Sequence, residues 1–275
     1  QKSDKQCTSR TSKFLDACRK ANAGELTENA LLDATVQLGF VNVISAFHVV
    51  GRSAIPRPFF TDERSNAGGI RITDEILAVT GPESADSLSE EAESRWRLVE
   101  TAWGLSVPRA VVTVDYDEET KDLFSIDTTK RRRSVTGTRG ALNGYQKGKC
   151  FYCFRPIAPK AELLPDVDHF FPHRLKQTQL GGVVDQVWNL VLACQECNRG
   201  SGGKFDSVPG PDLLKRLHRR NEFLIGSHHP LRETLIAQTG SNESGRRSFL
   251  NSVHVDAMGA LLRYWTPPER LGESF

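Results

Sequence analysis

Four cysteines in the second half of the chain are spaced as two metal-binding pairs. Cys150 and Cys153 form one Cys-x-x-Cys pair, and Cys194 and Cys197 form another, forty residues further along. Each short turn of this kind presents two thiolates to one tetrahedral ion. The start of the sequence lacks the apolar core of a signal peptide, so metal binding accounts for these pairs better than disulfides. The spacing predicts a structural Zn²⁺ site.

A second set of polar residues lies between and beside the cysteine pairs. Asp168 and His169 are adjacent between the two pairs, and Asn198 directly follows the second. Hydrolysis of a phosphodiester needs an activated water and relief of charge at the phosphate. Neighbouring residues on a strand face opposite sides, so Asp168 would face a cation while His169 acts as general base. Asp168 and Asn198 supply oxygen ligands, which suit Mg²⁺ or Mn²⁺.

The order of these residues resembles the HNH endonucleases, whose ββα-metal unit cuts nucleic acid with one divalent cation. The matching residues are Asp168-His169, Asn189-Leu190, Cys194 to Asn198, and Lys204. The resemblance covers about residues 145–206. It implies that His169 is the general base and that Asp168 and Asn198 are the metal ligands. It also implies that Asn189 braces the loop between the strands and orients the histidine, and that cleavage leaves 5′-phosphate and 3′-hydroxyl ends.

Two features depart from the commonest family pattern. Asn198 stands where the colicin-like branch has a histidine. The RNA-guided and restriction-type branches have an asparagine at this position, as this chain does. Lys204 comes later than the family's Asn-x-x-Lys, so Arg199 competes with it as the phosphate contact. His173 is interpreted as a phosphate contact or a loop residue in preference to a metal ligand, because oxygen ligands already suffice for a hard cation.

Charge is distributed unevenly along the chain. Residues 1–126 carry 14 Lys and Arg against 20 Asp and Glu, a net of −6, whereas residues 127–275 carry 22 against 14, a net of +8. The basic half therefore contains the motif, as a polyanion-binding surface requires. The predicted nucleic-acid contacts, which would neutralise phosphates without reading sequence, are Arg131, Arg132, Lys149, His173, Arg199 and Lys204. On the expected helix at 209–227, the basic residues Lys215, Arg216, Arg219 and Arg220 would add to this surface.

Hydrophobic periodicity predicts an α+β protein in two parts. A mostly helical accessory domain is expected over 1–126, and an HNH nuclease domain with its core at 145–206 and a helical C-terminal extension over 127–275. Trp96, Val99 and Trp103 are predicted to form the inner stripe of one helix. Residues 40–51 fit a strand or a buried helix equally well. The other expected elements are helices at 11–22, 27–38, 70–79, 87–105, 134–145, 209–227, 228–240 and 244–265, and a strand at 110–117.

These observations predict a metal-dependent endonuclease that hydrolyses DNA, with a role in restriction or defence as the suggested context. The alternatives are a ribonuclease with the same centre and a zinc-dependent nucleic-acid-binding module that does not cut. No run approaches the roughly 18 apolar residues of a membrane helix, so a cytoplasmic protein is expected. The acidic balance of the N-terminal part favours a protein partner or a homodimer there.

Overall fold

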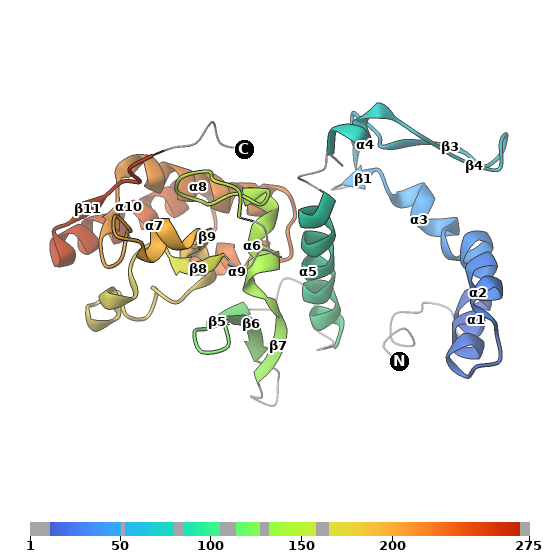
Figure 1. Ribbon diagram of the computed structural model, residues 1–275, viewed down its shortest axis with the longest axis horizontal. Helices are drawn as coiled ribbons and strands as arrows, with labels where there is room; N and C mark the ends of the chain where they lie inside the picture. Colours follow the sequence, from blue (N-terminus) through green and yellow to red (C-terminus); the bar gives the residue numbers. More distant parts are fainter. Residues whose placement is uncertain are drawn as a thin grey trace. The chain divides into compact units, whose positions relative to one another are not determined.

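The computed structural model describes residues 12–50, 53–79, 85–104, 114–126, 132–157 and 165–269 (Figure 1). The chain divides into two compact units, Gln1–Gly81 and Pro82–Phe275. The described residues mix helices and strands, which confirms the α+β class. The boundary predicted at residue 126 differs from this division, because a three-stranded sheet continues across it.

The first unit begins with helices whose ends follow from their caps. Ser12 accepts from the Leu15 backbone N–H at the start of α1 (Lys13–Asn22), and Thr27 caps α2 (Glu28–Ala34) through Ala30. The chain continues as the π-helical η2 (Thr35–Gly39) and then as α3 (Val41–Ala46). The ambiguous segment 40–51 therefore resolves as a helix followed by the short strand β1 (Val49–Val50).

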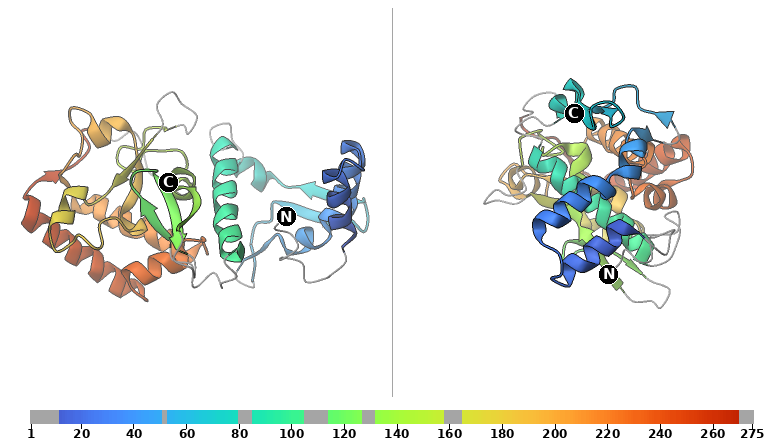
Figure 2. Two further views of the ribbon diagram at one scale, coloured as in Figure 1. Left: turned by 90° about the horizontal axis from the view of Figure 1, so that it is seen from below. Right: turned by 90° about the vertical axis from the view of Figure 1, so that its right-hand side faces the viewer.

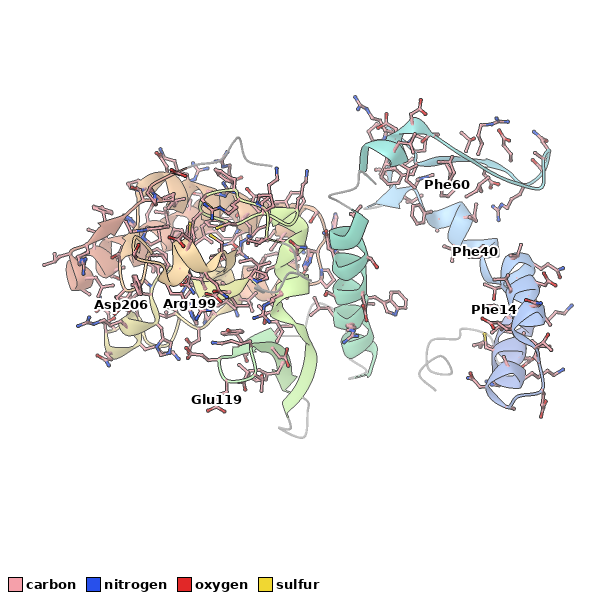
Figure 3. The ribbon with its side chains drawn as sticks, viewed as in Figure 1. Phe14, Phe40, Phe60, Glu119, Arg199 and Asp206 are labelled. Carbon is pink, nitrogen blue, oxygen red and sulfur yellow. The ribbon has the colours of Figure 1, made fainter. Side chains whose placement is uncertain are left out.

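Two small hairpins and a helix complete this unit. β1 pairs with β2 (Ser53–Ala54), and β3 (Phe60–Glu63) pairs with β4 (Gly69–Ile72). These strands lie partly in a segment, 53–69, for which no helix or strand was predicted, and the predicted helix at 70–79 begins only at α4 (Asp74–Val79). Of the side chains described in this unit, Phe60 alone is buried (Figure 3).

The second unit opens with a long helix against a small sheet. α5 (Ala85–Gly104) packs on β7 (Arg132–Gly137) and α6 (Thr138–Gln146). The sheet is an antiparallel meander of β5 (Val114–Asp117), β6 (Asp122–Ile126) and β7. Residues 134–137 therefore extend a strand, although a helix was predicted from 134. Residues 110–113 of the predicted strand and the side chain of Trp103 lie outside the description.

The inner face of α5 differs from the predicted one. Trp96 is 52% exposed, whereas Ser94, Leu98 and Val99 are buried. Ser94 and Leu98 stand one helical turn apart, so the buried stripe runs through them and leaves Trp96 on the outer side. The predicted stripe was therefore wrong for Trp96 and right for Val99, because the buried face of the helix runs through Ser94 and Leu98.

The centre of the second unit is a ββα arrangement. β8 (Asp166–His169) pairs antiparallel with β9 (Leu190–Ala193), placing Asp168 opposite Val191 and His169 opposite Leu190. Between them run the 3₁₀ turns η4 (His173–Gln177) and η5 (Val187–Asn189). The short helix α7 (Gln195–Arg199) follows β9 directly (Figure 1).

Three helices extend this centre toward the C-terminus. They are α8 (Pro211–Gly226), α9 (Arg232–Thr239) and α10 (Glu243–Leu261), seen in orange and red in Figure 2. Strand β10 (Val208–Pro209), before α8, pairs in parallel with β11 (Tyr264–Trp265), after α10. α9 packs on η5, and the fully buried Trp188 contacts Phe249 of α10, so one core joins the ββα centre to these helices. Among the helices described here, none combines the length and apolar character needed to cross a bilayer.

Candidate functional site

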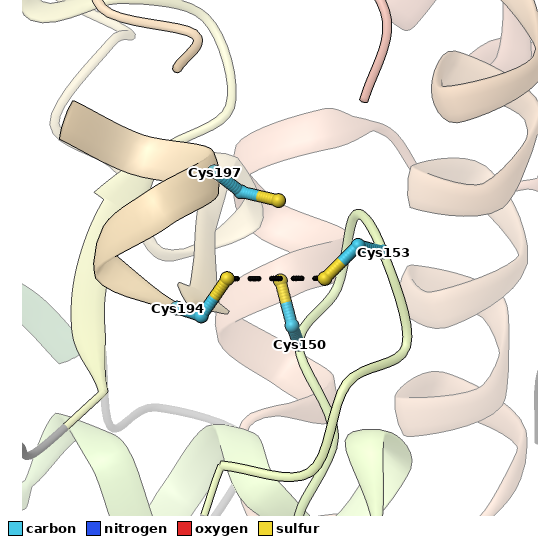
Figure 4. A group of neighbouring side chains, drawn as sticks. All are labelled: Cys150, Cys153, Cys194 and Cys197. Atoms are coloured by element: carbon cyan, nitrogen blue, oxygen red, sulfur yellow. Dashed lines mark hydrogen bonds between the residues drawn. The ribbon is translucent and has the colours of Figure 1, made fainter. Parts of the chain in front are cut away.

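The four paired cysteines converge on one point. Cys150 and Cys153 come from the turn after α6, and Cys194 and Cys197 from the start of α7 (Figure 4). Their sulfur atoms all lie within 4.8 Å of one another, and the Cys153 and Cys194 sulfurs are 3.8 Å apart. A tetrahedron with Zn–S bonds of about 2.3 Å has edges of about 3.8 Å. The cluster is compatible with a structural zinc site.

The adjacent residues of β8 face opposite sides, as strand geometry requires. Asp168 lies on the side of the cysteine cluster, where the Tyr152 hydroxyl donates to Asp168 Oδ2 at 2.6 Å. The ammonium of Lys204 stands 3.3 Å from Asp168 Oδ1. All three side chains are buried, and burial raises the pKa of Asp168 while Lys204 opposes that rise.

The glycine-rich segment after α7 explains the unusual spacing of Lys204. The Gly203 N–H donates to Gly200 O, and the Lys204 N–H returns to Cys197 O at 2.7 Å. The extra residues thus form a tight turn that brings Lys204 back under the site. Lys204 is only 1% exposed, with Nζ also 3.0 Å from His169 O. Lys204 is inaccessible to a phosphate, and this corrects its prediction as a phosphate contact.

Asn198, which was predicted to share a cation with Asp168, is bonded to a different carboxylate, that of Asp166. Its Nδ2 donates to Asp166 Oδ2 at 2.9 Å, and Arg199 Nε donates to the same oxygen at 3.0 Å. Asp166 precedes Asp168 by two residues, on the same face of β8. The sequence prediction overlooked Asp166, although its place in the alternating Asp-Val-Asp-His run was a usable signal.

The resemblance assigns a divalent cation to Asp168 and Asn198. In this structure the two side chains have different partners, and the charge of Asp168 is already offset by the Lys204 ammonium. A buried ammonium at 3.3 Å opposes a second cation on the same carboxylate. This donor arrangement therefore does not fit the implied cation.

The opposite face of β8 presents His169 to a polar cluster. His169 is 7% exposed, and its Nε2 lies 3.3 Å from Asp185 Oδ1. Tyr116 packs edge-on against its ring with centroids 5.7 Å apart. Burial lowers the pKa of His169 to about 4, even though Asp185 and Glu118 act in the other direction. The imidazole is therefore neutral near pH 7, which is the form that accepts a proton.

Three more side chains adjoin His169. His173 Nε2 lies 2.7 Å from Glu118 Oε2, and Lys176 Nζ lies 2.5 Å from Asp185 Oδ2. Glu118 belongs to the turn between β5 and β6, whereas Asp185 belongs to the loop before η5. Sequence reasoning missed both acids, because neither stands in a motif and only tertiary packing brings them to His169.

Asn189 joins the two ends of the loop between the strands. Its side-chain oxygen accepts from Phe171 N at 2.8 Å, while Nδ2 donates to Phe171 O at 3.0 Å and to Val184 O at 2.8 Å. The Phe170 N–H also donates to Asn189 O. Three of these four bonds hold Phe170 and Phe171, the residues that directly follow His169, and the fourth holds Val184 in the loop before η5.

The remaining predicted nucleic-acid contacts have different environments. Arg199 is well exposed beside Asp166 (Figure 3), while Lys149 is half-buried and His173 is turned toward Glu118. Arg131 and the side chain of Arg132 lie outside the described residues.

The basic face expected on α8 is smaller than predicted. Arg216 packs over the rings of Phe151 and Phe154, and Arg220 is buried with bonds to Trp188 O and Leu190 O. Both guanidinium groups therefore pack inside the protein, which corrects the prediction that they contact phosphates. Lys215 and Arg219 remain exposed on this helix.

Comparison with known proteins adds no relative at this point. Neither family models, nor curated proteins, nor solved structures yield a match to the chain.

Proposed function

We propose that this protein is an endonuclease of the HNH type that hydrolyses phosphodiester bonds of DNA, with His169 as the general base. The observation that carries the proposal is a buried, neutral histidine at the end of the first strand of a ββα unit, a histidine braced by Asn189 in a unit that also contains the four-cysteine cluster. Its residue order is the one on which the resemblance to HNH nucleases rests.

The chemistry requires a proton acceptor that is held still and kept neutral. His169 meets both requirements, because its burial favours the neutral imidazole and the bonds of Asn189 fix the backbone after it. We propose that Nε2 accepts the proton of a water that attacks the phosphorus atom. Because Asp168 and Asn198 do not fit a divalent cation, a cation that offsets the charge on the phosphate oxygens would have to be held by other residues.

The proposed zinc ion has a structural role. It would join the turn of Cys150 and Cys153 to the start of α7, and so fix the helix that follows β9. Restriction or defence is the biological context suggested for such an enzyme. The exposed Arg199 lies beside Asp166, on the face of β8 opposite His169, where it supplies a positive charge for a neighbouring phosphate of the DNA backbone.

The decisive test is cleavage of supercoiled plasmid DNA by the zinc-loaded protein with Mg²⁺ or Mn²⁺. His169→Gln should lower the rate by at least about a hundredfold, as expected when a general base is lost. The exposed His228 provides the matched control, and His228→Gln should cut like the wild type. Circular dichroism and zinc content should be unchanged in both variants.

The outcomes separate this proposal from its alternatives. Cleavage that survives in His169→Gln would exclude this histidine as the base. Cleavage of labelled RNA without cleavage of DNA would identify a ribonuclease with the same centre. A wild-type protein that binds nucleic acid yet cuts neither substrate would be the non-cleaving zinc module.

A further inference from the structure

We propose that Glu118, His173 and Asp185 form a binding site for a divalent transition-metal ion, directly beside His169. The three side chains come from separate parts of the second unit: the β5–β6 turn, the start of η4 and the loop before η5. One ligand atom from each lies within 4.8 Å of the other two. A single ion placed among them could therefore contact all three.

Buried polar atoms with no hydrogen bond face this cluster and indicate a missing ligand. His169 is 7% exposed and its Nε2 has no hydrogen-bond partner among the described residues, nor has Asp185 Oδ1, which stands 3.3 Å away. The Tyr116 hydroxyl is likewise buried without such a partner, and Glu118 and Asp185 both act on it electrostatically. Unsatisfied buried groups are rare, and an unseen ion or water is a common reason for them.

Lys176 accounts for the charge of the cluster when no metal is bound. Its Nζ lies 2.5 Å from Asp185 Oδ2 and 3.4 Å from Glu118 Oε2, so one ammonium is shared by two carboxylates. The cluster then keeps a net negative charge, because two acids face one lysine. The Lys176 side chain is 30% exposed, so it can turn into solvent when a divalent ion replaces it.

The donor set indicates which ion is suitable. One imidazole and two carboxylates favour a transition metal such as Mn²⁺ over Mg²⁺, which prefers oxygen ligands alone. Three protein ligands leave coordination positions open for water and phosphate. This arrangement differs from the Asp168 and Asn198 pair, which lies on the other face of β8 and contacts other residues.

The role of such an ion in catalysis rests on the proposed function, but the binding site itself does not. If phosphodiester hydrolysis occurs here, the ion would hold the phosphate on the His169 face of β8. Metal binding without substrate therefore tests the site, and plasmid cleavage separately tests the function.

The experiment titrates the full-length, zinc-loaded protein with Mn²⁺ and measures free Mn²⁺ by electron paramagnetic resonance. Glu118→Gln and Asp185→Asn should each weaken binding at least about tenfold relative to the wild type, since each removes a ligand. Lys176→Met should strengthen it, because the competing ammonium is gone. The exposed Glu119 adjoins Glu118 in sequence, so Glu119→Gln is the matched control and should bind like the wild type.

A second measurement reports the position of the ion independently of these substitutions. Substoichiometric Mn²⁺ should broaden the imidazole NMR signals of His169 and His173 and leave those of the exposed His228 sharp. Unchanged binding in Glu118→Gln and Asp185→Asn would overturn the proposal. Loss of binding only in Asp168→Asn or Asn198→Ala would assign the ion to the other face and overturn it equally.

A third result would also reject the site: a wild-type protein that does not bind Mn²⁺. If Mn²⁺ binds as expected but neither DNA nor RNA is cut, the site stands and the nuclease function falls. If the wild type cuts DNA but Glu118→Gln and Asp185→Asn bind Mn²⁺ normally, the nuclease function stands and the proposed metal site falls.

Discussion

The ammonium of Lys204 lies 3.3 Å from Asp168 Oδ1, and both side chains are inside the protein. A glycine-rich surface turn thus places a lysine in the core, where it neutralises an aspartate and donates to the carbonyl of His169. The pair therefore fixes the end of β8 from the face opposite the histidine ring. The pair therefore contributes to the stability of the fold, and the loss of one partner should be measurable as a lower free energy of unfolding.

Removing one partner of this pair should strongly destabilise the protein. Lys204→Met would leave Asp168 buried without its counter-ion, and such a change typically costs about 3–5 kcal/mol. Urea unfolding measures the loss. The control is Lys215→Met, because Lys215 is exposed and its ion pair is with the exposed Asp212, so less than about 1 kcal/mol is expected. Equal effects of the two substitutions would contradict the buried pairing.

The cysteine cluster should link zinc content to folding. Cys194→Ser removes one of four converging sulfurs, so it should lower the bound zinc and the unfolding temperature together. Cys18 lies in α1 of the first unit and is not one of the four clustered cysteines, so Cys18→Ser should change neither quantity. Metal analysis and thermal unfolding test both variants. A Cys194→Ser protein with full zinc and unchanged stability would refute the four-sulfur site.

In the turn that carries Lys204 inward, alanine should be tolerated at Gly202 but not at Gly203. A Cβ at Gly203 would lie 2.9 Å from backbone atoms of Gly200, whereas a Cβ at Gly202 would meet nothing within 4 Å. Gly203→Ala should therefore lower the free energy of unfolding by about 1–3 kcal/mol. Gly202→Ala should leave it nearly unchanged. If Gly202→Ala destabilised the protein more than Gly203→Ala, the backbone of this turn would have to follow a different path.

Asn189 should be among the most sensitive buried polar residues. Asn189→Ala removes three side-chain hydrogen bonds and leaves buried groups of Phe171 and Val184 without partners. The expected loss of stability is at least about 2 kcal/mol, measured by urea unfolding. Asn251 is exposed on α10, and Asn251→Ala serves as the control with little expected effect. A mild effect at Asn189 would remove the physical basis of its bracing role.

His229 should make stability depend on pH in the acid range. Burial, with Arg95 and Arg220 nearby, lowers its pKa from 6.5 to about 3. The folded state therefore resists protonation, so this contribution is complete above pH 6.5 and is lost as pH falls toward 3, at about 1.4 kcal/mol per pH unit. In the wild type the Leu231 N–H donates to His229 Nδ1 at 3.1 Å. His229→Asn keeps a side-chain acceptor for this N–H while removing the titrating group.

The measurement compares unfolding free energies between pH 6 and pH 4. The wild type should lose about 2–3 kcal/mol more than His229→Asn over this interval. His228→Asn changes the exposed neighbour, so it should retain the wild-type dependence. Parallel pH profiles for the wild type and His229→Asn would show that His229 is not kept neutral by folding.

Features that depend on short stretches of sequence were predictable. The caps at Ser12 and Thr27 act within one helical turn, and Gly240 ends α9 with a φ of 128°, a backbone conformation that favours glycine. The convergence of the four cysteines also followed from the spacing of the pairs. In each case the determining atoms lie within a few residues of one another, or belong to a metal-binding spacing with few structural solutions.

Features created by tertiary packing were not predictable in the same way. Glu118 and Asp185 reach His169 from a hairpin turn and a loop without any motif, and Glu118 fell in the part assigned to another domain. Lys204 and Arg220 looked like surface cations, yet each is buried with polar partners. Charge and periodicity describe a residue's tendency, whereas burial depends on the neighbours that the whole fold supplies.

The C-terminal strand limits how this protein could be divided. Trp265 donates from Nε1 to Gly202 O at 2.8 Å and packs edge-on against Tyr152, the residue that bonds Asp168. A tryptophan 63 residues beyond Gly202 therefore packs beside the turn that carries Cys150 and Cys153. Residues 145–206 therefore do not form an independent module that could be moved into another protein. A recombination event or designed fusion that moved them alone would leave behind the last strand on which their packing depends.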